Sequence, residues 1–265
     1  MLKEAHLALH TLEEGHWWFV GARAVYRSLL STGLGEPKKD RRMLEIGCGS
    51  GGNLALLEEY GPTVGVDISS LALSLIHARP TLGLVQASAT ALPFVGSSFE
   101  GVNLFGVIEH LDDDESALGE AARVCRSGGV LTLLTSALPI LWSHHDEANL
   151  HKRRYYPKEL LDKLQRAGWK PIRLSFENFV TFFPTLLIRF FQRLSPQSAR
   201  YDMGRTPTII NNILLYILCL EARAIKYISL PIGVDLVTVS RLVTGPDKRN
   251  LGYVNPKSNQ ISKNS

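Results

Sequence analysis

The 265-residue chain is 45% hydrophobic and 20% charged, with a formal net charge of +4. This composition is ordinary for a globular protein and is enough for one sizeable buried core. The tail beyond residue 244 holds four basic residues against one acidic residue, so about one of the +4 charges belongs to the body. So weak a positive field argues against a nucleic-acid surface, and we expect no nucleic-acid partner.

The cysteines and the N-terminal residues bear on the cellular compartment. Cys48, Cys125 and Cys219 are widely spaced and form no CxxC pair, which favours free thiols in a reducing compartment over disulfides or a cysteine zinc site. The first ten residues lack the apolar core of a signal peptide. We identify no stretch of roughly 18 apolar residues, the length that is needed to span a bilayer. We therefore expect a cytoplasmic protein that contacts a membrane only at its surface.

The first half of the chain alternates between helical and strand-like segments. Residues 1–40 are predicted to form N-terminal helices, and short apolar strands then alternate with helices. Such an alternation is typical of a parallel sheet that is covered on both faces. The predicted strands are 43–47, 63–67, 82–86, 101–105 and 129–135, and the predicted helices between them are 52–60, 69–78 and 113–125.

The second half of the chain is less regular. A polar, histidine-rich loop is followed by a helix that Gly168 ends, a strand, an aromatic and apolar stretch at 177–230, and a last strand at 234–243. The sequence thus predicts a three-layer α/β sandwich with a mostly parallel, seven-stranded sheet. We expect a single domain over 1–244, divided into N-terminal helices (1–40), a cofactor-binding core (41–136), an acceptor-side loop and apolar lid (137–232) and a closing strand (233–244), with a disordered polar tail at 245–265.

A glycine-rich loop lies directly between the first predicted strand and the next helix. Gly47, Gly49 and Gly51 let the backbone turn sharply and approach a ligand near the free N–H groups of a helix N-terminus. The spacing fits both GxGxG and the GxGxxG of dinucleotide enzymes. Glu45 precedes the loop, and Asp67 ends the second strand, where a carboxylate can accept both hydroxyls of a ribose. The alternative role for Asp67 is an N-cap of the following helix.

Four segments carry a resemblance to a known family. LEIGCGSGGN, VGVDIS, ALPFVGSSFEGVNLFGVIEHL and AARVCRSGGVLTLL follow one another within residues 42–136. In order and spacing this block resembles class I S-adenosylmethionine-dependent methyltransferases, most closely the bacterial type 11 group. The resemblance implies a Rossmann-like sandwich and S-adenosylmethionine as the cofactor.

The resemblance also implies a role for individual residues. Glu45, Gly47 and Gly49 would line the methionine end of the cofactor, with Cys48 filling the loop and Gly51 shaping it. Asp67 would hold the ribose and Ile68 would pack on the adenine. Ser88, followed by Ala89, stands where many relatives carry an aspartate for the adenine amino group, so this contact would be weaker. Phe105 and Gly106 would border the sulfonium.

The loop after the fifth strand supplies the candidate catalytic residues. It lies at the carboxyl end of the sheet, where open α/β folds bind their ligands. A histidine titrates near neutrality and suits a general base; we expect His145 first, oriented by Asp146, and His151 second. A metal site and a purely structural loop are the alternatives. We predict no metal ligands, because HHDExxxH (144–151) lacks the HExxH spacing and GVIEH has Gly106 where an ExxEH site needs a glutamate.

The sequence therefore predicts in-line methyl transfer, chiefly to oxygen, on a small-molecule, sugar or lipid-linked acceptor. Residues 177–230 would form a buried cover over the sheet, a lid over a hydrophobic acceptor, or a face that rests on a membrane. One alternative is an inactive scaffold that binds the cofactor or a membrane surface. Another is an NAD(P)-dependent reductase, which needs a YxxxK pair, and the tail residues Tyr253 and Lys257 form the one such pair in the chain.

Overall fold

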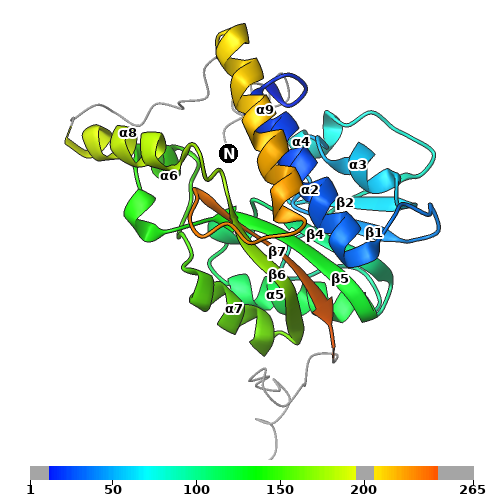
Figure 1. Cartoon of the computed structure of the whole chain (residues 1–265). Coiled ribbons are helices and arrows are strands. Elements are labelled where there is room, and N and C mark those ends of the chain that lie inside the picture. The colour runs from blue at the N-terminus through cyan, green and yellow to red at the C-terminus, as the bar shows by residue number, and fades with distance from the viewer. Residues whose placement is uncertain (1–11, 195–205, 244–265) are drawn as a thin grey trace, which may run out of the picture.

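The computed structural model describes residues 12–194 and 206–243. Seven strands form one sheet in the order β3-β2-β1-β4-β5-β7-β6 (Figure 1). The fold class predicted from the sequence is confirmed. The strands are β1 (Met43–Ile46), β2 (Thr63–Asp67), β3 (Leu82–Gln86), β4 (Phe99–Phe105), β5 (Cys125–Ser136), β6 (Trp169–Glu177) and β7 (Asp235–Leu242).

The strand order explains where a ligand can bind. β1 to β5 are parallel, and the order reverses between β1 and β4, because the chain builds outward from β1 in both directions. Such a switch point leaves a crevice at the carboxyl ends of the strands. β7 is antiparallel to both β5 and β6 and lies between them, so the chain leaves the sheet after β6 and returns to fill the gap.

Helices cover both faces of the sheet (Figure 1). The described helices are α2 (Trp17–Leu34), α3 (Leu54–Glu58), α4 (Ser70–Ser74), α5 (Asp114–Val124), α6 (His144–Ala148), α7 (Pro157–Arg166), α8 (Phe182–Leu194) and α9 (Thr208–Ile225), with short 3₁₀ turns η1 (Ile108–His110) and η2 (Pro139–Leu141).

Two hydrophobic cores lie on opposite faces of the sheet. Strand residues alternate between faces, and in β5 Leu133 packs into the core that contains α5 and α7, whereas Leu134 packs into the core of α2 and α9. Each fully buried leucine of this kind stabilises the fold by about 1.5–3 kcal/mol. This packing on both faces explains why the central strands read as continuous apolar runs.

The predicted loop at 137–155 contains a short helix that the sequence analysis missed. Ser143 accepts a hydrogen bond from the backbone N–H of His145, and Asp146 accepts one from the backbone N–H of Ser143. This reciprocal capping starts α6. Residues 1–11 of the predicted N-terminal helices and the predicted disordered tail at 245–265 lie outside the described residues.

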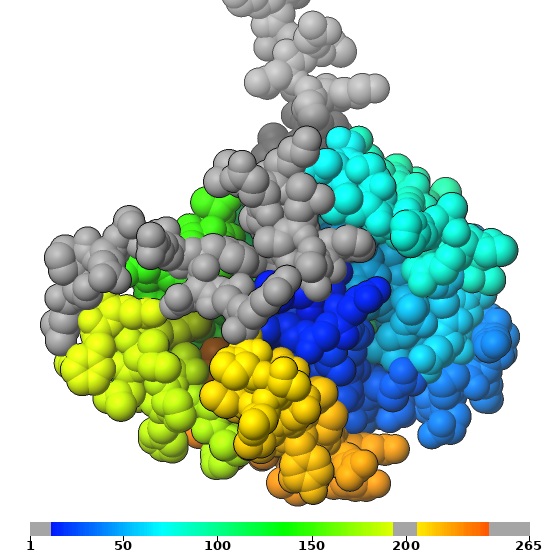
Figure 2. Space-filling model, turned by 90° about the horizontal axis from the view of Figure 1, so that it is seen from above, coloured from blue at the N-terminus to red at the C-terminus, as the bar shows by residue number. Residues whose placement is uncertain are grey.

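One prediction about membrane segments was wrong. α9 has 18 residues with a mean hydropathy of 1.5, which is long and apolar enough to cross a bilayer, although only 22% of it is buried. In this structure α9 packs along α2 through Leu218 and Ala222. Figure 2 shows α8 and α9 reaching the surface on the same side of the molecule as the start of α2.

Candidate functional site

The glycine loop between β1 and α3 has a backbone that favours glycine. Gly47 (φ 74°) and Gly49 (φ 54°) lie in the left-handed region, which is costly for other residues. A Cβ at Gly47 would come within 2.5 Å of the Val107 side chain, whereas a Cβ at Gly49 would meet nothing within 4 Å. Gly49 therefore faces open space in which a ligand can approach the backbone.

Glu45, on β1 beneath this loop, has one oxygen without a partner. The side chain is buried, and its Oε1 accepts a hydrogen bond of 3.0 Å from Asn53 Nδ2, while Oε2 is buried and unpartnered. Burial raises the pKa of Glu45 to about 8. A buried acceptor of this kind is costly unless a donor reaches it, and an ammonium group on a ligand would satisfy it and favour its ionised form.

Asp67 joins the end of β2 to the glycine loop. Its Oδ2 accepts a hydrogen bond of 2.9 Å from the backbone N–H of Gly49, and its Oδ1 accepts one of 2.8 Å from Ser69. The N-cap of α4 is Ser69, whose side chain accepts from Ala72, so the alternative role of Asp67 as the cap is wrong. Each carboxylate oxygen still has lone pairs for further donors.

The residues predicted at the adenine end lie on the surface near Asp67. Ile68 is 72% exposed, which is unusual for a large aliphatic side chain and leaves it free to pack on a flat ring. Ser88 and Ala89 are half-buried. The Ser88 hydroxyl pairs with Thr90 Oγ1 at 2.9 Å and accepts from the Thr90 backbone, so it is already engaged within its own turn.

A cavity of about 520 Å³ connects the glycine loop to the loop after β5. Five of the predicted cofactor residues line it: Gly47, Cys48, Gly49, Phe105 and Gly106. His145 and His151 line the same cavity, so the structure brings the predicted cofactor loop and the predicted bases into one space. Burial raises the pKa of the Cys48 thiol far above its usual range, which fits a filler of the loop and not a nucleophile.

Asp146 is the centre of a buried polar network at the acceptor end. It is fully buried, and its carboxylate accepts hydrogen bonds from His151 Nδ1 at 2.9 Å and from Arg154 Nε at 2.7 Å. Arg189 of α8 approaches it at 3.4 Å. Burial alone would raise the pKa of Asp146, but these hydrogen bonds and positive charges outweigh burial and hold it well below its usual range.

The prediction that Asp146 orients His145 was wrong. Asp146 orients His151 and not its neighbour His145, because the chain after α6 turns back and the backbone N–H of His151 donates to the carbonyl of Asp146 at 2.8 Å. The Nε2 of His145 instead lies 3.1 Å from Asn149 Nδ2. Burial, followed by the charge of Arg189, lowers the pKa of His145 to about 4, so it is a weaker base at neutral pH than an ordinary histidine.

Several residues that line the cavity were not predicted from the sequence. Tyr26 of α2 stacks on Phe105, with ring centroids 3.8 Å apart and planes 3° apart. Glu109, Asn178 and Asp235 also line the cavity. These residues come from η1, the end of β6 and the start of β7. The three segments are far apart in the chain, so local sequence patterns do not predict that they line one cavity.

Comparison with known proteins identifies the core of the chain. The family model of the methyltransferase domain matches residues 44–133. In this part the chain is similar to S-adenosylmethionine-dependent methyltransferases of the type 11 group. The matched region contains the glycine loop, Asp67 and the turn that carries Glu109, and for this region the similarity indicates S-adenosylmethionine as the cofactor. The network around Asp146 lies beyond the matched residues.

Curated relatives support this assignment over part of their length. A probable S-adenosylmethionine-dependent methyltransferase of Mycolicibacterium smegmatis is 31% identical over 164 residues, which cover 60% of this chain and 62% of the relative. A malonyl-[acyl-carrier protein] O-methyltransferase of Enterobacter lignolyticus is 33% identical over 133 residues, or 46% of this chain and 51% of that protein. The chain thus spans about half to three fifths of the length of these relatives.

Solved structures share the fold at low sequence identity. The protein bound to the Haloferax volcanii Trm112 methyltransferase activator has a TM-score of 0.60 and 16% identity, covering 91% of this chain and 95% of that one. The geranyl diphosphate C-methyltransferase of Streptomyces coelicolor has a TM-score of 0.55 and 14% identity, covering 82% and 76%. These likenesses support the Rossmann-like fold.

The first prediction concerns the cofactor. The unpartnered Oε2 of Glu45 and the open face of Gly49 fit the ammonium and carboxylate of a methionyl group. Purified protein should therefore bind S-adenosylhomocysteine in the micromolar range, about −8 kcal/mol, and should not bind NAD. Calorimetry with both ligands measures this, and NAD binding without adenosylhomocysteine binding would contradict it.

The second prediction concerns the ribose. Asp67→Ala should weaken adenosylhomocysteine binding by about 2 kcal/mol, because charge-assisted hydrogen bonds to the ribose are lost. Since Asp67 also holds the backbone of Gly49, Asp67→Asn is the matched variant that keeps an acceptor oxygen. Unchanged affinity in Asp67→Ala would show that the carboxylate serves only the loop.

Proposed function

We propose that the chain transfers the methyl group of S-adenosylmethionine to a hydroxyl oxygen of a small-molecule, sugar or lipid-linked acceptor. One observation carries this proposal: a single cavity joins the glycine loop to the pair formed by Asp146 and His151. A methyl donor at one end and a proton-accepting group at the other are the two requirements of O-methylation.

The residues around the cavity would divide the work between binding and alignment. When bound, S-adenosylmethionine supplies a methyl group that its sulfonium makes electrophilic. Phe105, held by its stack on Tyr26, would form a rigid apolar wall at the transfer point and exclude water. Asp146 would fix the ring of His151 through Nδ1, which leaves Nε2 directed to other partners. Alignment of this kind contributes much of the rate of such a reaction.

The experiment that tests this proposal uses S-adenosylmethionine carrying ¹³C in its methyl group. The full chain is incubated with aqueous and lipid fractions of a bacterial extract, and carbon NMR separates O-methyl, N-methyl and C-methyl products by chemical shift. An O-methyl signal that depends on the protein supports the proposal. A C-methyl or N-methyl signal would overturn the O-methylation, and intact cofactor binding without any product would favour the inactive scaffold.

The surface beside the cavity favours a lipid-linked acceptor. Thr185 and Arg189 of α8 line the cavity, while other side chains of the same helix face outward. Large apolar side chains exposed by a third or more gather on α8 and α9: Phe183, Leu187, Ile188, Phe190, Phe191, Ile209, Ile210, Ile213, Tyr216 and Leu220. We propose that this surface rests on a membrane, since a contiguous apolar surface marks a contact site.

The third prediction tests this membrane face. Phe183 and Phe190 are 65% and 54% exposed, and each would gain favourable burial if the face inserts into lipid. The double variant Phe183→Asp with Phe190→Asp should lower co-sedimentation with phosphatidylcholine–phosphatidylglycerol vesicles at least tenfold, as about 3 kcal/mol or more of apolar burial is lost. Val95→Asp, at a site 79% exposed away from α8 and α9, is the matched control. Equal vesicle binding by all three proteins would refute the proposal.

A further inference from the structure

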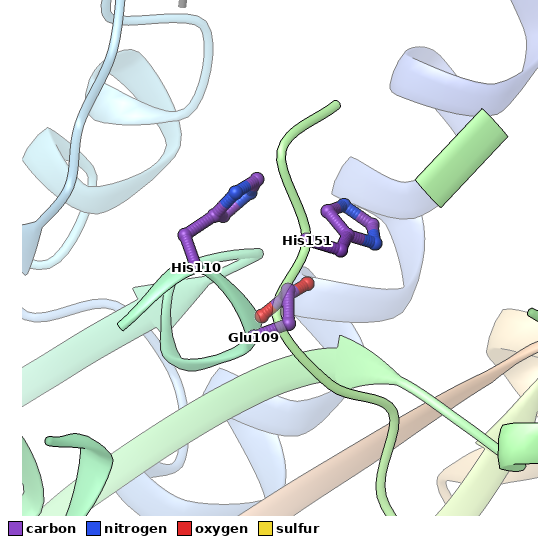
Figure 3. Close-up of side chains that lie close together, drawn as sticks. All are labelled: Glu109, His110 and His151. Carbon is purple, nitrogen blue, oxygen red and sulfur yellow. The ribbon is translucent and has the colours of Figure 1, made fainter. Parts of the chain in front are cut away.

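Glu109, His110 and His151 form a cluster in the lining of the cavity. Glu109 and His110 belong to η1, the turn after β4, whereas His151 comes from the segment after α6 (Figure 3). One ligand atom from each residue lies within 4.8 Å of the other two. The two imidazole rings are 4.7 Å apart between centroids and nearly perpendicular, at 83°.

Each of these side chains is oriented from behind by a second group. His151 Nδ1 is 2.9 Å from Asp146 Oδ1, so its Nε2 is left for another partner. Thr135 Oγ1 donates to Glu109 Oε2 at 2.9 Å, which leaves Oε1. The His110 ring lies beside the backbone of Asn149 and Leu150. Metal-binding histidines and carboxylates are oriented in this way, with a carboxylate, a hydroxyl or a carbonyl behind the ligand.

We infer that Glu109, His110 and His151 bind a divalent transition-metal ion, with Zn²⁺ as the reference ion. Two imidazoles and one carboxylate are the ligands of open, catalytic zinc and iron sites, whereas Mg²⁺ prefers oxygen ligands alone. Ligands at about 2.1 Å from a tetrahedral ion lie about 3.4 Å apart. The cluster therefore needs to close by no more than about 1.4 Å, which side-chain rotation can supply.

The position of this site defines what the ion would do. All three residues line the cavity that also holds Gly49, Phe105 and Gly106, so the fourth ligand position opens toward the acceptor. For methyl transfer this role rests on the proposed function. The acceptor hydroxyl would bind the ion and release its proton to water, because a bound cation lowers the pKa of a ligated hydroxyl. The oxygen would then form a bond to the methyl carbon while the carbon–sulfur electron pair stays on sulfur.

The test is metal binding by the full chain after chelator treatment and dialysis. Calorimetry with Zn²⁺ should show one site, and Co²⁺ should give a d–d absorption band that Zn²⁺ displaces. We expect at least about 10-fold to 100-fold weaker Zn²⁺ binding in each of the variants Glu109→Gln, His110→Ala and His151→Ala. Changing a residue that only orients a metal ligand already costs this much, and these variants change the ligands themselves. His144→Ala is the matched control. His144 is exposed and begins α6, the helix that precedes His151, so this variant should bind Zn²⁺ like the wild type.

The outcomes separate the metal site from the proposed function. Equal Zn²⁺ binding by the wild type and the three ligand variants, with circular dichroism showing all of them folded, would overturn the site. If a ligand variant does not fold, His110→Ala decides, because His110 lies outside the network of Asp146. Zn²⁺ binding without methyl transfer supports the site and counts against the proposed function. Full O-methyl transfer by chelator-treated protein that binds no Zn²⁺ overturns the site and leaves the function standing.

Discussion

Replacing Asp146 by alanine should lower the free energy of unfolding by about 3–5 kcal/mol, the cost of removing one partner from a buried ion pair. The carboxylate is fully buried and holds Arg154 Nε at 2.7 Å. Arg154 is itself buried and would keep its charge without its counterion. The same substitution removes the capping contact from the carboxylate to the Ser143 backbone, so α6 should lose order as well.

Urea unfolding followed by circular dichroism measures this effect. Glu147→Ala is the matched control: it is the next residue of α6, and its half-exposed carboxylate pairs with His144 at 3.1 Å, so the expected change is below about 1 kcal/mol. A loss of less than about 1 kcal/mol in Asp146→Ala would show that the network contributes little to folding.

The pH dependence of stability should change in a second variant, Asp146→Asn. The network lowers the pKa of Asp146 in the folded protein, so its contribution is fully present above the unfolded pKa of about 3.9 and is lost as the pH falls toward the lower folded value. The difference in stability between wild type and Asp146→Asn should therefore shrink below about pH 4. A difference that grows on acidification would contradict this assignment.

The first half of the fold could be predicted from the sequence because its signals are local. β1 to β5 are short apolar segments, separated by helices except between β3 and β4, and Gly47 to Gly51 mark the turn at which the first strand ends. The same local signals identified Asp67 at the end of β2. The position of β7 between β5 and β6 depends on pairing across about sixty residues, and the sequence shows only that a last strand exists.

The acceptor end of the site was harder to predict because it is built from distant segments. His151 was identified as a candidate, but its partner could not be chosen, since Asp146 adjoins His145 in the sequence and contacts His151 in space. The prediction of no metal ligands considered GVIEH and the histidine-rich loop separately. The structure places Glu109 and His110 beside His151, an arrangement that neither segment shows alone. Tyr26 was missed for the same reason.

His151→Ala should lower the turnover of methyl transfer by about 10²-fold to 10⁴-fold, the usual cost of losing a group that removes a proton in the transition state. The loss is expected whether the Nε2 of His151 takes the proton itself or binds an ion that acidifies the hydroxyl, because either role acts on the acceptor oxygen. Adenosylhomocysteine affinity should stay within about threefold, since His151 follows α6 and is not part of the glycine loop.

His145→Ala is the informative comparison for this prediction. In the wild type, the pKa of about 4 and the contact with Asn149 make His145 a poor base at neutral pH. Removal of His145 should therefore lower turnover less than removal of His151 does. Single-turnover assays on both variants, with calorimetry for cofactor affinity, give the two effects separately. A thermal melt controls for folding, because Asp146 keeps Arg154 as a partner in His151→Ala and a loss of only about 1 kcal/mol is expected. Near-native turnover in His151→Ala would place proton removal elsewhere, and a larger loss in His145→Ala than in His151→Ala would restore His145 as the base.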